Sequence, residues 1–77
     1  SAAMTPFRHF GRDSRGVDIW RAEIAGLRLV ILSHVTSGIE LRRAGPDWDW
    51  SDQPTSGGFR SPEAARDYAV RMLGEDA

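Results

Sequence analysis

Two tryptophans lie among three aspartates in the segment GPDWDWSDQPTSGG. In an extended chain, side chains alternate between two sides, so Trp48 and Trp50 point one way and Asp47 and Asp49 the other. Two roles follow from this arrangement. The rings close a small core, or they form an aromatic contact for a protein partner, with Asp52 completing an acidic rim. Stacking on nucleic-acid bases is disfavoured, because neighbouring carboxylates repel a phosphate backbone.

The sequence offers few other groups for chemistry. It has no cysteine, which excludes disulfides and thiolate metal sites. His9 and His34 lack the spacing of zinc ligands, and DWDWSD lacks the central glycine and terminal glutamate of a calcium loop. No GxSxG motif is present, and SGG at 56–58 lacks the lysine and helix of a phosphate-binding loop. We therefore expect a protein that is not an enzyme and uses no cofactor or metal.

All ten basic residues are arginines, and the formal net charge is −1. Arginine suits planar, bidentate contacts with carboxylates and phosphates, but a GC-rich genome gives the same composition. The net charge provides no bulk attraction to nucleic acid or to an anionic membrane. An alternative, DNA-binding surface would use the arginines of an N-terminal arm and of one sheet face: Arg8, Arg12, Arg15, Arg21, Arg28, Arg42 and Arg43.

Two alternating segments, VDIWRAEI and LRLVILSHV, predict a β-hairpin. A two-residue loop at Ala25-Gly26 sets Ile24 against Leu27. The same register pairs Glu23 with Arg28 on the opposite face. The register that gathers the apolar residues on one face therefore also pairs the charges on the other.

A second turn, TSG at 36–38, predicts a three-residue hairpin loop in which Gly38 supplies the positive φ. It leads into a third strand, IELRRA. The expected register sets Ser33 against Leu41 and His34 against Glu40, and it predicts a cross-strand hydrogen bond between His34 and Glu40. The DWDW segment is expected to form a short fourth strand or an extended flap, and SDQPTSGG a loop.

The last segment has the features of an amphipathic helix. Ser61 is a suitable N-cap and Pro62 suits the first helical position. Asp67 and Arg71 have the i,i+4 spacing of a surface ion pair, and Gly74 is expected to end the helix. The apolar stripe consists of Ala65, Tyr68, Ala69, Met72 and Leu73.

This order of elements predicts an α+β fold: a three- to four-stranded antiparallel sheet, β-β-β-(β)-α, covered on one face by one C-terminal helix. Residues 17–77 are expected to form the single domain. Residues 1–16 are expected to hold an expression remnant before Met4 and an arginine-rich arm, which Phe7 and Phe10 pin or which forms a short edge strand.

With one helix, only one face of the sheet can be buried, so Val30 and Leu32 would be exposed among arginines. The N-terminal arm, a second copy of the chain or a partner would then cover them. An apolar centre with an arginine rim has the composition of an interface. The expected partner-binding residues are Trp48, Trp50, Asp47, Asp49, Asp52, Arg21, Arg28, Val30, Leu32 and Arg42.

The closing pattern GGFRSPEAARDYAVRML resembles the end of small modules built from a three-stranded sheet and a helix, most clearly at Phe59, Ser61, Glu63, Ala64 and Ala69. Such modules include the arm-type DNA-binding domains of phage-like tyrosine recombinases and small phage or mobile-element proteins, among them anti-CRISPR inhibitors. The first resemblance implies a sheet that enters the major groove of DNA. The second implies a stand-alone inhibitor of a host defence complex, and this class fits the length of the chain better.

We therefore expect a cytoplasmic, non-enzymatic module that binds a protein partner, in its narrowest form a mobile-element inhibitor of the anti-CRISPR kind. A small DNA-binding module and a homodimeric accessory protein are the alternatives. The longest apolar run, LRLVIL, is too short to span a membrane and is interrupted by an arginine.

Overall fold

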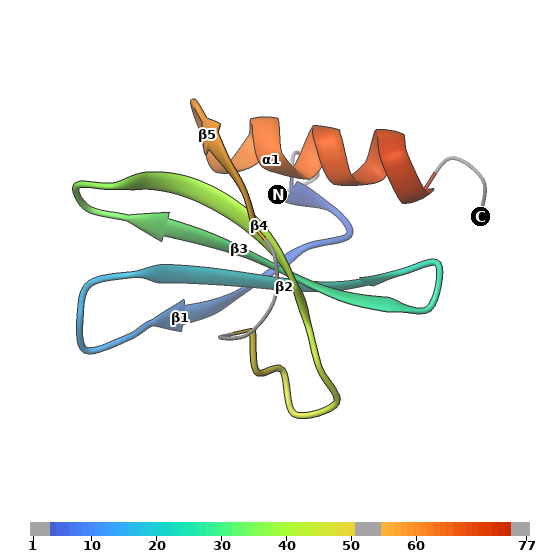
Figure 1. Ribbon diagram of the computed structural model, residues 1–77, viewed down its shortest axis with the longest axis horizontal. Helices are drawn as coiled ribbons and strands as arrows, with labels where there is room; N and C mark the ends of the chain where they lie inside the picture. The colour runs from blue at the N-terminus through green and yellow to red at the C-terminus, as the bar shows by residue number, and fades with distance from the viewer. Residues whose placement is uncertain (1–3, 51–54, 75–77) are drawn as a thin grey trace.

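The chain folds as one antiparallel sheet with a C-terminal helix lying across one of its faces (Figure 1). This is a computed structural model, and it describes residues 4–50 and 55–74. The elements are β1 (Arg8–Arg12), β2 (Asp18–Ile24), β3 (Leu27–His34), β4 (Gly38–Ala44), β5 (Thr55–Phe59), the α-helix α1 (Pro62–Ala69) and a π-helical turn, η2 (Val70–Gly74). The α+β class and the antiparallel sheet are confirmed. The expected strand number was too low, since the sheet has five strands in the order β1-β2-β3-β4-β5.

The hairpin of β2 and β3 has the predicted register. Ile24 pairs with Leu27, and Glu23 pairs with Arg28. Both loop residues have positive φ, 53° at Ala25 and 79° at Gly26. Positive φ at both loop positions is the requirement of a type I′ turn, whose twist matches that of the strands.

Replacing Ala25 by glycine is expected to stabilise the protein by about 1 kcal/mol, because alanine at positive φ is strained and glycine is not. Ala25 is exposed, so no packing is lost. Urea unfolding followed by circular dichroism measures the change. An unchanged or lower unfolding midpoint would contradict the assignment of this turn.

The hairpin of β3 and β4 differs from the expected register by two residues. His34 pairs with Gly38, and Ser33 pairs with Ile39. The loop is Val35–Ser37, and Gly38, with φ 97°, begins β4. Because side chains alternate with a period of two, this shift leaves every residue on the face where it was expected.

The segment before Val17 is not a separate arm, since β1 pairs with β2 as an edge strand. The pairing passes through a bulge between His9 and Gly11. Phe7 is buried in the core beneath the helix. Of the two expected arrangements of this segment, the structure has the edge strand.

The DWDW segment, expected to form a short fourth strand or an extended flap, is not the strand that pairs with β4 at the edge of the sheet. Residues 47–50 are not in a strand, and β5 is formed by Thr55–Phe59, of which residues 55–58 belong to the segment expected to be a loop. The sequence of β5 does not have a strand pattern, because it contains two glycines and glycine is depleted in strands. Its pairing with β4 is irregular between Ile39 and Leu41.

The helix begins as predicted, because the Ser61 side chain accepts a hydrogen bond from the Ala64 N–H at 3.1 Å. Of the apolar stripe, Ala65 and Ala69 are buried, whereas Tyr68 and Met72 are exposed. The predicted ion pair of Asp67 with Arg71 is wrong. Asp67 pairs instead with its neighbour Arg66, at 2.8 Å.

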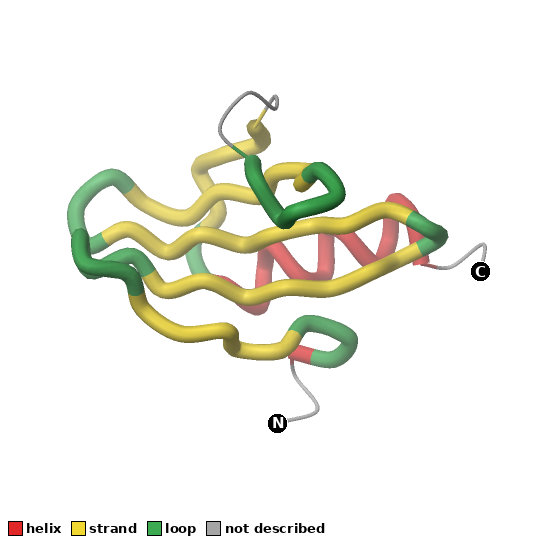
Figure 2. The backbone as a smooth tube through the Cα atoms, turned by 90° about the horizontal axis from the view of Figure 1, so that it is seen from below, coloured by secondary structure: helices red, strands yellow, loops and turns green. Residues whose placement is uncertain are grey.

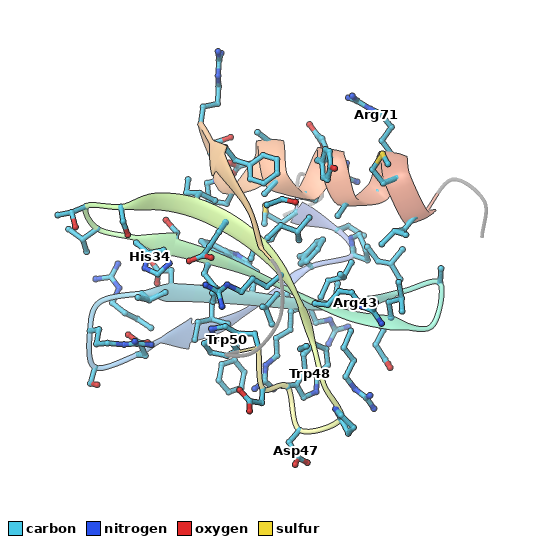
Figure 3. All side chains as sticks on the ribbon, viewed as in Figure 1. His34, Arg43, Asp47, Trp48, Trp50 and Arg71 are labelled. Atoms are coloured by element: carbon cyan, nitrogen blue, oxygen red, sulfur yellow. The ribbon has the colours of Figure 1, made fainter. Side chains whose placement is uncertain are left out.

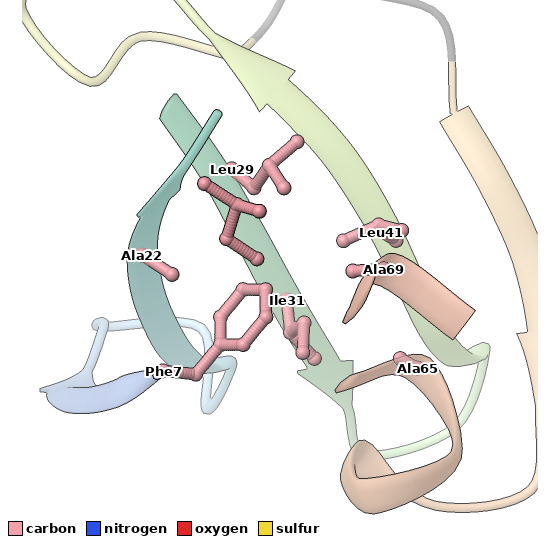
Figure 4. Packing of buried hydrophobic residues seen from close by; sticks show 8 residues of the cluster. Phe7, Ala22, Leu29, Ile31, Leu41, Ala65 and Ala69 are labelled. Carbon is pink, nitrogen blue, oxygen red and sulfur yellow. The ribbon is translucent and has the colours of Figure 1, made fainter. Parts of the chain in front are cut away.

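Two separate apolar clusters lie on the two faces of the sheet, and this corrects the expectation of one open face. The first cluster, under the helix, joins Phe7, Ala22, Ile24, Leu29, Ile31, Leu41, Ala65 and Ala69 (Figure 4). The second joins Val17, Ile19, Val30 and Leu32. Val30 and Leu32 are 0 % and 1 % exposed, because Trp48 and Trp50 pack against them. The loop at 45–50 crosses the face opposite the helix (Figure 2).

Candidate partner-binding surface

The loop that covers the second face is a tight turn after β4. The Trp48 N–H donates to the Gly45 carbonyl at 2.9 Å, and the Gly45 N–H donates to the Asp49 carbonyl at 2.9 Å. Pro46 follows Gly45 and supplies the φ that the first central position of such a turn favours. The loop therefore returns the chain over the sheet within five residues.

Trp48 occupies the left-handed region, with φ 62°. In three-residue loops of this kind, that position favours glycine, and a bulky side chain there is strained. With this backbone conformation, the indole ring lies on the side of the sheet away from α1 (Figure 3). Trp48 and Trp50 are both half-buried and pack against the second cluster, which is the first of the two roles considered for them.

Arg21 lies between two aromatic rings. Its guanidinium carbon is 3.6 Å from the centroid of the Phe10 ring and 4.9 Å from that of Trp48. Arg28 lies on the same ring of Trp48, at 5.9 Å. A guanidinium over an aromatic face is held by electrostatic attraction to the ring. The arrangement joins β1, β2, β3 and the 45–50 loop at one place.

The Arg21 side chain has a hydrogen-bond donor without a partner. Its Nε is buried and has no hydrogen-bond partner. Within residues 4–50 and 55–74, no carboxylate forms an ion pair with it. Arg8 pairs with Arg21 across β1 and β2 and so shares its face. Two cations therefore stand together at this edge of the sheet.

A hollow of about 370 Å³ lies beside this stack. It is lined by Pro6, Arg8, His9, Phe10, Arg21, Ala22, Glu23 and Trp48. Phe10 is 59 % exposed, and sequence reasoning placed it only as an anchor of the arm. The sequence does not reveal the position of Phe10, because it depends on the bulge between His9 and Gly11, which is known only from the register of β1.

A second hollow, of about 310 Å³, lies at the other end of the loop. There the carboxylate of Glu40 accepts hydrogen bonds from His34 Nε2 at 2.5 Å and Arg42 Nε at 2.7 Å. Arg42 also donates to the Trp50 carbonyl at 3.2 Å. The hydrogen bond predicted between His34 and Glu40 is present, although the two residues are not directly opposite. This network fastens the loop to the sheet.

The acidic residues expected at the surface lie beside the loop. Asp47 and Asp49 are exposed, whereas Asp52 lies outside the described residues. Of the expected partner-binding set, the structure brings Arg21, Arg28, Arg42, Trp48 and Trp50 onto the face opposite the helix. Val30 and Leu32 lie beneath them and are not accessible to a partner.

The arginines of the DNA-binding alternative do not form one patch. Arg43 lies on the helix face, because it pairs with Leu29 of the first cluster. Arg12 pairs with Asp18 at 3.0 Å, and Arg15 pairs with Asp13 at 3.0 Å. The hydrogen bond from Arg12 lowers the pKa of Asp18 below its ordinary value. Arg12 and Arg15 are therefore paired with the protein's own carboxylates.

Asp13 holds the turn between β1 and β2, and we expect acid to weaken this turn. The Val17 N–H, followed by Arg15, lowers the pKa of the Asp13 carboxyl. A lowered pKa stabilises the fold above the unfolded value of about 4, and this contribution is lost as pH falls through the folded pKa. The stability difference between wild type and Asp13→Asn should therefore shrink below about pH 4. Urea unfolding from pH 7 to pH 2 measures it, and a constant difference would contradict the role of the carboxylate.

In the described part of the chain, no group of three or more histidines, aspartates or glutamates is arranged to hold a metal ion. None of the helices described there has the length and apolar character needed to cross a membrane. Comparison with models of protein families, with curated proteins and with solved structures finds no significant match to this chain.

Proposed function

We propose that the protein is a small non-enzymatic module that binds a protein partner through the edge formed by Phe10, Arg21 and Trp48. The observation that carries this proposal is the arginine held between a half-buried tryptophan and a largely exposed phenylalanine. Tryptophan and arginine are enriched at the few interface positions that supply most of the binding energy. The loop that carries Trp48 is already folded, so little ordering is required on binding.

The inhibitor expected from the resemblance would act through the same surface, by occupying a subunit of a host defence complex. The dimeric alternative loses its main support, because Val30 and Leu32 are covered by the chain's own loop. The surface also departs from a nucleic-acid site. Its arginines are interspersed with the exposed Glu23 and Asp47, and these carboxylates repel a phosphate backbone.

Affinity capture tests the proposal with two matched variants. Phe10 and Met72 are large apolar side chains with nearly equal exposure, 59 % and 57 %. Phe10 lies on Arg21, on the face opposite the helix, whereas Met72 lies near Leu29 and Leu41, on the helix face. The immobilised protein is incubated with a lysate of the organism that encodes it. We expect Phe10→Ala to weaken capture of the partner by about thirtyfold, as for a hot-spot residue. Met72→Ala should capture as much as wild type. Equal capture by both variants would overturn the proposal.

A further inference from the structure

We propose that the hollow beside Arg21 binds a carboxylate side chain of the protein partner, held by Arg21 and Arg8 between the rings of Phe10 and Trp48. The inference rests on the proposed function, because it names the chemistry that the same surface recognises. The binding site is the hollow of about 370 Å³ that these four residues help to line.

The first support is the state of the Arg21 guanidinium. Phe10 and Trp48 lie close to it, and the Arg21 side chain lines the hollow, where its guanidinium N–H groups are the donors that an occupant meets. The Nε donor is buried and has no partner in the protein. A buried donor without a partner lowers stability. A carboxylate satisfies two guanidinium donors at once, in a planar, bidentate pair.

The second support is the composition of the hollow. Among its lining residues, Arg8 and Arg21 supply positive charge, and Pro6, Phe10 and Trp48 supply apolar surface. A carboxylate near apolar walls interacts more strongly with an arginine than it does in open water, because the local dielectric constant is lower. The hollow therefore suits an acidic side chain with an apolar group beside it.

The charges around the hollow favour a peptide over a nucleic acid. Glu23 lines the hollow, and Asp47 is exposed on the same loop as Trp48. A polyanion that crosses this surface meets both carboxylates. A peptide can instead place one acidic side chain at Arg21 and neutral or basic residues beside Glu23 and Asp47.

The test uses 3-phenylpropionate as the probe, because it joins a carboxylate to an aromatic ring. Its neutral analogue, 3-phenylpropionamide, is the matched control. Binding is followed in ¹H–¹⁵N spectra through the Arg21 Nε–H and the Trp48 indole N–H. A ligand of about eleven heavy atoms should bind with a dissociation constant of about 1 mM. The amide should bind about tenfold more weakly, since it cannot form the charge-assisted pair.

Variants locate the site. Arg21→Gln should lose the preference for the carboxylate, and Arg21→Lys should weaken it although the charge is kept, because lysine lacks the planar fork. Arg43→Gln, which removes an arginine from the helix face, should bind as wild type does. Equal binding of the acid and the amide to wild type would overturn the inference without any variant. Tighter, Arg21-dependent binding of an eight-nucleotide oligothymidylate would overturn it in favour of nucleic acid.

The two proposals fail separately. If Phe10→Ala abolishes capture but the acid and the amide bind equally, the partner surface stands and the carboxylate site does not. If the acid binds at Arg21 but capture does not depend on Phe10, the hollow is an anion site and the partner lies elsewhere.

Discussion

Replacing Leu32 by alanine is expected to lower the free energy of unfolding by about 2–5 kcal/mol, the usual cost of emptying a core position. Leu32 is 1 % exposed, on the sheet face opposite the helix. Ile31→Ala, on the helix face, should lose a similar amount, because Ile31 is also fully buried. A domain of this size has a total stability of about 4–12 kcal/mol, so either variant is marginal. Chemical denaturation at low temperature measures both.

The control is Val35→Ala, in the turn between β3 and β4, where the side chain is 79 % exposed. It should change stability by less than about 0.5 kcal/mol. If Leu32→Ala behaved like Val35→Ala, the second face would be open to solvent or to a partner, and the loop at 45–50 would not be its cover. The comparison therefore distinguishes a sheet with two cores from a sheet with one.

Replacing Trp48 by alanine is expected to lower the free energy of unfolding by about 2–3 kcal/mol, through the loss of packing over the second cluster. Trp48→Gly should be less damaging than Trp48→Ala by about 1 kcal/mol, because glycine adopts positive φ without strain. Urea unfolding of both variants measures the difference.

The reverse order is expected at Arg43, which lies in β4 and has ordinary backbone geometry. There the glycine variant should be less stable than the alanine variant by about 0.5–1 kcal/mol. If glycine were also the worse residue at position 48, the left-handed conformation of Trp48 would be wrong. The proposed partner-binding surface depends on that conformation, since it brings the indole ring to Arg21.

The features predicted correctly from the sequence are those that a few neighbouring residues determine. The type I′ turn at Ala25-Gly26 determines its own register, and the Ser61 cap begins the helix, so both were readable without the fold. The β3–β4 hairpin was predicted two residues out of register, because the sequence does not show whether Val35 lies in the strand or in the turn. Alternation preserved the faces in spite of that shift.

Neighbouring residues did not predict the edge strand β5 or the second apolar cluster. Each edge strand is short, carries glycine and pairs through an irregularity, so its sequence pattern is weak. An open face was expected because the chain has one helix. A short loop with two tryptophans packs against the four buried side chains of that face instead.

Only part of the candidate site was predicted from the sequence. Arg21 and Trp48 were among the expected residues, since both stand out by type and position. Their meeting with Phe10 was not expected, because it requires the pairing of β1 with β2 and the return of the 45–50 loop. Contacts between segments far apart in the sequence come from the tertiary fold.

The order of the strands has a consequence for how quickly the molecule assembles. Each strand is hydrogen-bonded to the strand that precedes or follows it in the chain, and no crossover interrupts the series. Closing short loops loses little chain entropy, so successive hairpins can zip together from the central pair outward. We expect refolding within milliseconds, at the fast end of the range for sheet proteins, with the helix docking last.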